Sequence, residues 1–76
     1  MPKITPTHWT VPEKIFLLDG WQFDRQEGSR RSYVKPGVAR LIVIPAYHSV
    51  PVSIIRSNMR TANMSRERYF ALLSQV

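Results

Sequence analysis

Residues 21–44 have the sequence WQFDRQEGSRRSYVKPGVARLIVI, which decides the fold because it contains three strand-like runs and two turns. Residues 21–25 alternate aromatic and polar side chains, which is the period of two expected for a half-buried strand. Gln26-Glu27-Gly28 then predicts a turn, and residues 29–34 run back as a second strand. This part of the sequence therefore predicts a hairpin.

The third strand follows the turn Lys35-Pro36-Gly37, where proline and glycine stand in places natural for a turn. Residues 39–44 are β-branched and nearly all apolar, so they should form the best-buried strand. Pro45 ends it. Because short turns join all three runs, the sequence predicts a three-stranded antiparallel meander.

A first helix is expected before the meander, over about residues 11–19. Thr10 and Glu13 have the spacing of a capping box, with Thr10 as the N-cap and Glu13 reaching back to it. Gly20 supplies the C-terminal stop. The apolar residues expected on one face of this helix are Val11, Ile15 and Leu18.

Two helices are expected after the meander, over residues 51–62 and 66–74. Pro51 opens the first of them, and Asn63 should end it in a left-handed conformation. Ser65 should cap the second. The inner side of residues 51–62 is predicted to consist of Ile54, Ile55, Asn58, Met59 and Ala62. The predicted fold class is α+β, with the order α-β-β-β-α and a short extra C-terminal helix.

Length and composition narrow the class of protein. The 76 residues suffice for a single domain, which we place at 10–76 after an extended lead-in at 1–9. The chain has no cysteine, which excludes disulfides and thiolate metal sites. It has neither an apolar run long enough to cross a bilayer nor the apolar core of a signal peptide. We therefore expect a cytoplasmic protein with no membrane partner.

The charge distribution suggests a polyanionic partner. Net charge is +6, from eleven Lys and Arg against five acids. Between Glu27 and Glu67 there is no acid, and the bases in that interval are Arg30, Arg31, Lys35, Arg40, Arg56, Arg60 and Arg66. Arginine makes planar, bidentate contacts to phosphate, so this interval predicts a nucleic-acid-facing surface. A surface that is merely soluble and basic is the alternative left open.

Residues 15–73 resemble the HicA toxins of bacterial and archaeal toxin–antitoxin systems. The matching features, in chain order, are Gly20-Trp21, Arg25, Gly28-Ser29, Tyr33, Ile44-Pro45, Pro51 and Ser65-Arg66-Glu67. The resemblance implies a double-stranded-RNA-binding-domain-like fold and a ribosome-independent endoribonuclease that cleaves mRNA. It also implies a HicB-type antitoxin as partner and no metal or cofactor.

Arg30 stands where the resemblance implies the catalytic histidine. Imidazole can exchange a proton near neutral pH, whereas guanidinium cannot give up its proton in a protein. Arg30 could hold phosphate but could not be the general base, so we expect an impaired enzyme. The sequence leaves open whether Arg30 is native or an inactivating substitution. The residues expected to contact RNA are Gly28, Ser29, Arg30, Arg31, Lys35, Arg40, Arg56 and Arg60.

Two other functions remain open. One is a non-catalytic module that engages RNA or an antitoxin through the basic face. The other is a helix-turn-helix DNA-binding protein built from the last two helices, although the apolar Tyr69 and Phe70 suggest a packing helix. His8 and His48 are forty residues apart and lack acidic neighbours, so they are poor metal ligands.

Overall fold

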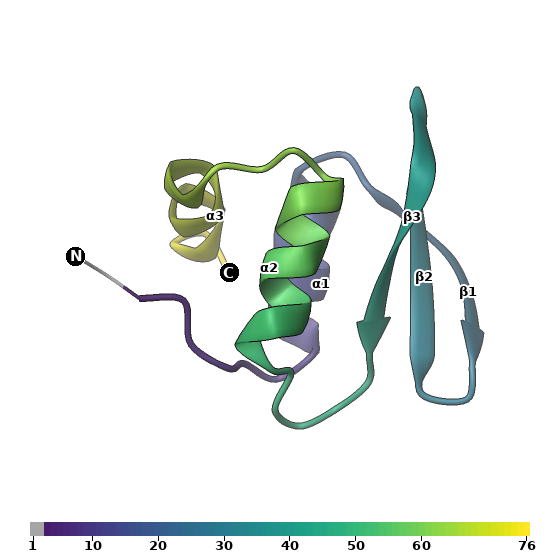
Figure 1. The fold of residues 1–76 in the computed structure, drawn as a ribbon, viewed down its shortest axis with the longest axis horizontal. Helices are drawn as coiled ribbons and strands as arrows, with labels where there is room; N and C mark the ends of the chain where they lie inside the picture. Colours follow the sequence, from purple (N-terminus) through teal and green to yellow (C-terminus); the bar gives the residue numbers. More distant parts are fainter. Residues whose placement is uncertain (1–2) are drawn as a thin grey trace.

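The computed structural model describes residues 3–76, which fold as three helices and one sheet (Figure 1). The elements are α1 (Thr10–Leu18), β1 (Gln22–Glu27), β2 (Arg30–Lys35), β3 (Val38–Pro45), α2 (Val52–Thr61) and α3 (Arg66–Leu73). The strands are antiparallel in the order β1-β2-β3. This confirms the predicted α+β class and the meander, in a double-stranded-RNA-binding-domain-like arrangement.

The sheet has one buried face and one open face. Figure 1 shows the helices on one side of the strands. Tyr33 on β2 pairs with Ile42 on β3, and both side chains are fully buried. Because neighbouring strand residues point to opposite faces, Arg30 and Ser32 belong to the other face. We call that second face the open face.

The third strand has the most buried residues of the three, but its first half, residues 38–41, is exposed, so the prediction of a best-buried strand holds only for its second half. Ile42 and Ile44 are completely buried, whereas every residue of β1 is exposed. The burial of β3 nevertheless alternates, because Leu41 is 45% exposed and lies toward the open face. The apolar run predicts a well-buried strand, but the helices lie on one side of the sheet and leave its other side open (Figure 1).

The predicted start of α1 is wrong. Trp9, not Thr10, is the N-cap, and no side chain caps the helix. The carboxylate of Glu13 does not reach back; it bonds Arg31 and Tyr33 of β2 instead. The Arg31 guanidinium offers the Glu13 carboxylate an ionised donor, whereas the cap would have offered it a neutral backbone N–H.

The predicted face of α1 is also partly wrong, while its end is confirmed. Ile15 and Phe16 are fully buried, but Leu18 is 48% exposed. Gly20 adopts φ 96°, its N–H bonds the carbonyl of Leu17, and the N–H of Trp21 bonds the carbonyl of Phe16. These two bonds form a Schellman motif, which turns the chain toward β1.

The predicted α2 and α3 are confirmed to within one residue at their ends, although Ile54 and Ala62 of the predicted inner side are only half-buried. Pro51 is the extended N-cap of α2, and Asn63 has φ 53°. The hydroxyl of Ser65 accepts a hydrogen bond from the Arg68 backbone N–H at 3.1 Å. The side-chain amide of Asn58, a buried polar group, donates to the carbonyl of Val43 at 3.1 Å. That bond ties α2 to β3.

The described part of the lead-in, residues 3–9, packs onto the loop before α2. Thr7 forms an antiparallel bridge with Val50, and the N–H of Trp9 donates to the carbonyl of Tyr47. Ile4 is buried in the same core as α2 and α3. Met1 and Pro2 of the predicted lead-in lie outside the described residues. Among the helices of residues 3–76, none has the length and apolar character needed to cross a membrane.

Candidate functional site

The turn between β1 and β2 fixes the position of Arg30. Gly28 has φ 60°, and Glu27 pairs directly with Arg30, so the turn contains two residues with glycine first. Glycine tolerates this left-handed φ at no steric cost. The carbonyl of Ser29 accepts a 2.6 Å hydrogen bond from the N–H of Ala46. Arg30 is therefore the first residue of the central strand, and the turn before it and the hydrogen bond to Ser29 fix its position.

Arg30 borders two hollows, one over the open face and one at the β3 edge of the sheet beside α2. The smaller, of about 240 Å³, lies over the sheet; its lining residues are Arg25, Glu27, Arg30, Ser32, Leu41 and Val43. The larger, of about 560 Å³, lies between the sheet and α2; its lining residues are Arg30, Leu41, Val43, Pro45, Tyr47, Ile54, Ser57, Asn58 and Thr61. Arg30 is the residue with a charged side chain that the two hollows share.

The charge at Arg30 is available to a ligand. Arg30 is exposed, and it forms no ion pair or side-chain hydrogen bond with any residue in the described part of the chain. Its neighbour Arg25 is held by Glu27 at 2.9 Å. The hydroxyl-bearing residues around the larger hollow are Tyr47, Ser57 and Thr61. A guanidinium among hydroxyls suits a phosphodiester, since arginine makes charge-assisted, bidentate bonds to phosphate.

Arg31, the next residue, is engaged on the opposite face. Its guanidinium bonds the Glu13 carboxylate at 2.9 Å, the Tyr33 hydroxyl at 3.1 Å and the Gln26 side-chain oxygen at 2.6 Å. It also stacks on the rings of Trp9 and Phe23. We call Glu13, Arg31 and Tyr33 the β2–α1 charge cluster. Its guanidinium is committed within the protein.

Burial dominates the acid–base behaviour of Tyr33. Its hydroxyl donates to the Glu13 carboxylate at 2.5 Å. Loss of solvent, together with the hydrogen bond to the Glu13 carboxylate, raises the pKa of Tyr33 to about 12, although the Arg31 guanidinium opposes this shift. Tyr33 is therefore neutral at any physiological pH, and it serves as a donor that fixes Glu13.

We expect the free energy of unfolding to fall by about 2–3 kcal/mol as pH rises from about 10 to about 12. In the unfolded chain Tyr33 releases its proton near pH 10, whereas the folded chain holds it until about pH 12. The stability that comes from the raised pKa of Tyr33 is fully present below pH 10 and is lost above about pH 12. Urea unfolding of the unchanged chain and of Tyr33→Phe across this range measures it. The same slope in both proteins would contradict the assignment.

The other residues predicted to contact RNA do not form one patch with Arg30. Lys35 lies 3.7 Å from the Asp19 carboxylate, near α1. Arg40 is exposed on β3, near the tip where the β2–β3 hairpin projects beyond the helices (Figure 1). Arg56 and Arg60 are exposed on α2. The continuous run of bases in the sequence is therefore divided among several surfaces.

The two histidines are brought together, which no pattern in the sequence indicates. The ring centroids of His8 and His48 lie 5.3 Å apart, because residues 7 and 50 pair as an isolated bridge. The hydroxyl of Thr10 lies 2.9 Å from Nδ1 of His8. Neither histidine lines the hollows around Arg30. Within residues 3–76 no group of three potential His, Asp or Glu metal ligands is found.

The comparison with protein families decides the class. A family model described as the HicA toxin of bacterial toxin–antitoxin systems matches residues 12–64. The chain belongs to the HicA toxin family. The match covers α1 from its third residue, the whole sheet and α2, and so includes the turn that carries Arg30. Members of this family are toxins of toxin–antitoxin systems and generally ribonucleases. No curated protein sequence matched the chain.

Several residues around Arg30 were not among the predicted contacts. Tyr47, Ser57 and Thr61 come from a loop and a helix far along the chain. Nothing local marks them, because hydroxyl residues are common on solvated surfaces. The spacing of Ser57 and Thr61, four apart on one helix face, was the single available signal. It could not show which element they would face.

Proposed function

We propose that this HicA-family chain is an RNA-directed toxin that receives mRNA across the open face of its sheet, with Arg30 at the centre of the site. The observation that carries the proposal is the free guanidinium of Arg30, at the start of β2 and on the border of both hollows. The family assignment supplies the reaction class, endoribonuclease action on mRNA. We place the protein in the cytoplasm, where mRNA is present.

The chemistry available at this site is incomplete. Metal-free RNA cleavage requires a group that takes a proton from the ribose 2′-hydroxyl and returns one to the leaving oxygen. Arg30 can bind the phosphate and stabilise developing negative charge, but it cannot accept a proton. Neither hollow is lined by a histidine. We therefore propose that the chain binds RNA and cleaves it weakly or not at all.

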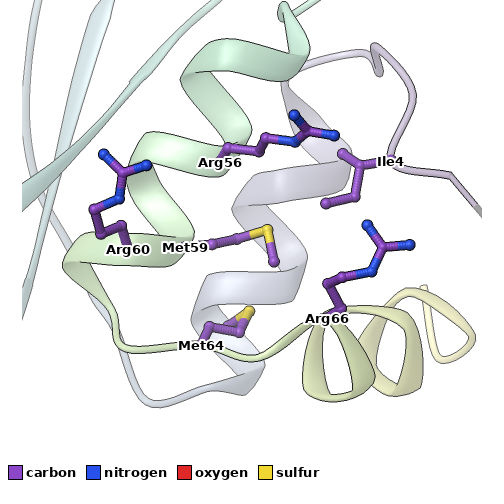
Figure 2. A pocket seen from close by; sticks show the side chains of 6 residues that line it. All are labelled: Ile4, Arg56, Met59, Arg60, Met64 and Arg66. Atoms are coloured by element: carbon purple, nitrogen blue, oxygen red, sulfur yellow. The ribbon is translucent and has the colours of Figure 1, made fainter.

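The proposed RNA-contacting residues are exposed and form no ion pair within the described residues, although they are not all on the open face. Gly28 and Ser29 present the turn, Arg30 binds a phosphate, and Arg40 and Arg60 extend the path. Arg31 and Lys35 are left out because Glu13 and Asp19 hold them. Arg60 follows the hollow-lining Ser57 on α2, and in Figure 2 its guanidinium points away from those of Arg56 and Arg66.

We expect RNA binding that weakens steeply with salt. Each phosphate contact releases counterions, so removing one contact should lower the slope of log affinity against log salt by about 0.7 for single-stranded RNA. Arg30→Ala and Arg60→Ala should each reduce the slope by about that amount and weaken binding several-fold. Fluorescence anisotropy with labelled single- and double-stranded RNA, from about 50 to 200 mM salt, measures both quantities.

Arg68→Ala is the matched control for this experiment. It removes the same charge from an exposed arginine that pairs with Asp19 at 3.2 Å, on a different surface. Its RNA affinity and slope should stay close to those of the unchanged chain. An affinity that is absent or flat with salt would contradict the proposal. An equal loss of RNA affinity in Arg68→Ala would show that binding depends only on the net charge of the protein.

A HicB-type antitoxin is the second proposed partner, covering the strand surface around Arg30. The family assignment supports an antitoxin of some kind. An adjacent gene for an acidic HicB-like protein would agree with this proposal. A second candidate function is a non-catalytic module that engages RNA or antitoxin through the same face, favoured by the lack of imidazole in either hollow. The helix-turn-helix alternative is disfavoured because α3 buries Tyr69 and Leu72.

A further inference from the structure

A second groove lies on the other side of α2 from the sheet. It has a volume of about 360 Å³, and its lining residues are Ile4, Arg56, Met59, Arg60, Met64 and Arg66. Figure 2 shows Arg56 on α2 and Arg66 on α3 reaching toward Ile4 over this groove. It shares no lining residue with either hollow at Arg30. A ligand here would leave the open face accessible.

The floor of the groove is apolar and adaptable. Ile4, Met59 and Met64 form it, each with less than a tenth of its surface exposed. Methionine is unbranched and polarisable, so a methionine-rich surface can adjust to side chains of different shape. A groove of this size suits one large apolar side chain, with the rest of the ligand lying across the rim.

The rim of the groove is cationic. Arg56 and Arg60 form no ion pair with any residue in the described part of the chain. No acidic side chain lines the groove. Arginine forms planar, bidentate bonds to carboxylates as it does to phosphates. The positive charge of the rim therefore favours an anionic ligand. The apolar floor distinguishes a peptide from a nucleic acid.

The floor favours a peptide over a nucleic acid. Proteins that hold single-stranded RNA stack its bases on aromatic rings or guanidinium planes over a solvated backbone track. Among residues 3–76 no aromatic side chain lines this groove, its guanidinium groups lie at the rim, and its floor consists of aliphatic and thioether side chains. An apolar side chain flanked by carboxylates satisfies both the floor and the rim. Protein interfaces are likewise enriched in methionine and arginine and depleted in aspartate and glutamate.

We propose that this groove binds an acidic segment of a protein partner, with one large apolar side chain on Met59 and Met64 and a carboxylate on Arg56. The proposal concerns a surface separate from the open face and does not depend on the function proposed above. A partner whose carboxylate binds Arg56 would leave Arg30 open to RNA, and Arg60 is the one proposed RNA contact that also lines the groove. The groove is therefore an interaction surface in its own right.

The test uses two synthetic peptides and the methionine methyl signals of the full chain labelled with ¹³C-methyl methionine. One peptide is Asp-Glu-Phe-Glu-Leu-Asp-Glu; the other has glycine in place of its phenylalanine and leucine. We expect the first to shift the Met59 and Met64 methyl signals saturably, and to bind about tenfold or more tightly than the second, because the buried side chain adds apolar contact. Equal binding of the two peptides, or no shift with either, would overturn the proposal.

Charge variants identify the rim. Arg56→Glu should weaken the first peptide by about tenfold or more. Arg40→Glu makes the same charge change on the projecting hairpin and should have little effect. Equal losses would show attraction by net charge and overturn the proposal. An RNA oligonucleotide is the third probe: saturable shifts of the Met59 and Met64 signals by RNA, with none by peptide, would assign the groove to nucleic acid instead.

Discussion

Arg30→His should raise RNA cleavage by about 10²–10⁴-fold and restore growth arrest when the protein is induced. The substitution supplies an imidazole, which neither hollow has, at the position where the HicA family resemblance implies the catalytic histidine. The turn at Gly28 and the hydrogen bond from Ala46 to Ser29 already hold this position in place. The fold should not change, because residue 30 is exposed. Growth after induction and the integrity of RNA in vitro are the two measurements.

Two controls separate a restored site from an added histidine. Arg40→His places the same imidazole on the projecting hairpin and should remain inactive. A chelator should leave the cleavage by Arg30→His unchanged if the mechanism uses imidazole alone. If Arg30→His is folded yet harmless and leaves RNA intact, the impaired-toxin proposal fails. The non-catalytic binding module would then take its place.

The sheet could be predicted because its signals are local. Gly28, Gly37 and Pro45 mark where each strand ends, and the alternation between them sets the register. The same period of two places Arg30 and Arg31 on opposite faces, as the structure confirms. The left-handed Asn63 and the cap at Ser65 are local signals of the same kind. These features depend on neighbours within a few residues.

The candidate site was less predictable because ion pairing is a long-range property. Because no acid lies between Glu27 and Glu67, the sequence predicts that the bases in this interval form one surface. Their partners precede that interval: Glu13 binds Arg31, and Asp19 lies beside Lys35. The capping-box pattern concealed the first of these pairs by giving Glu13 a different role. Glu13 fits a capping box and can also form an ion pair. Only the folded arrangement shows that Arg31 lies within reach of its carboxylate.

The second large effect concerns the β2–α1 charge cluster. We expect Arg31→Met to lower the free energy of unfolding by about 3 kcal/mol, because the Glu13 carboxylate would stay largely buried and lose its cationic partner. The Glu13 and Arg31 side chains are 18% and 19% exposed. Glu13→Gln should destabilise similarly. The double variant should cost less than the two single costs together, by about 1–3 kcal/mol.

The chain contains its own control, the ion pair between Arg25 and Glu27. Its nitrogen and oxygen atoms are 2.9 Å apart, the same separation as in the Arg31–Glu13 pair, but its side chains are 65% and 72% exposed. Arg25→Met should therefore cost no more than about 0.5 kcal/mol, since solvent screens an exposed pair. Chemical denaturation of the variants gives each free energy. If Arg31→Met costs no more than Arg25→Met, burial adds nothing to the cluster, and Arg31 becomes available again as an RNA-binding residue.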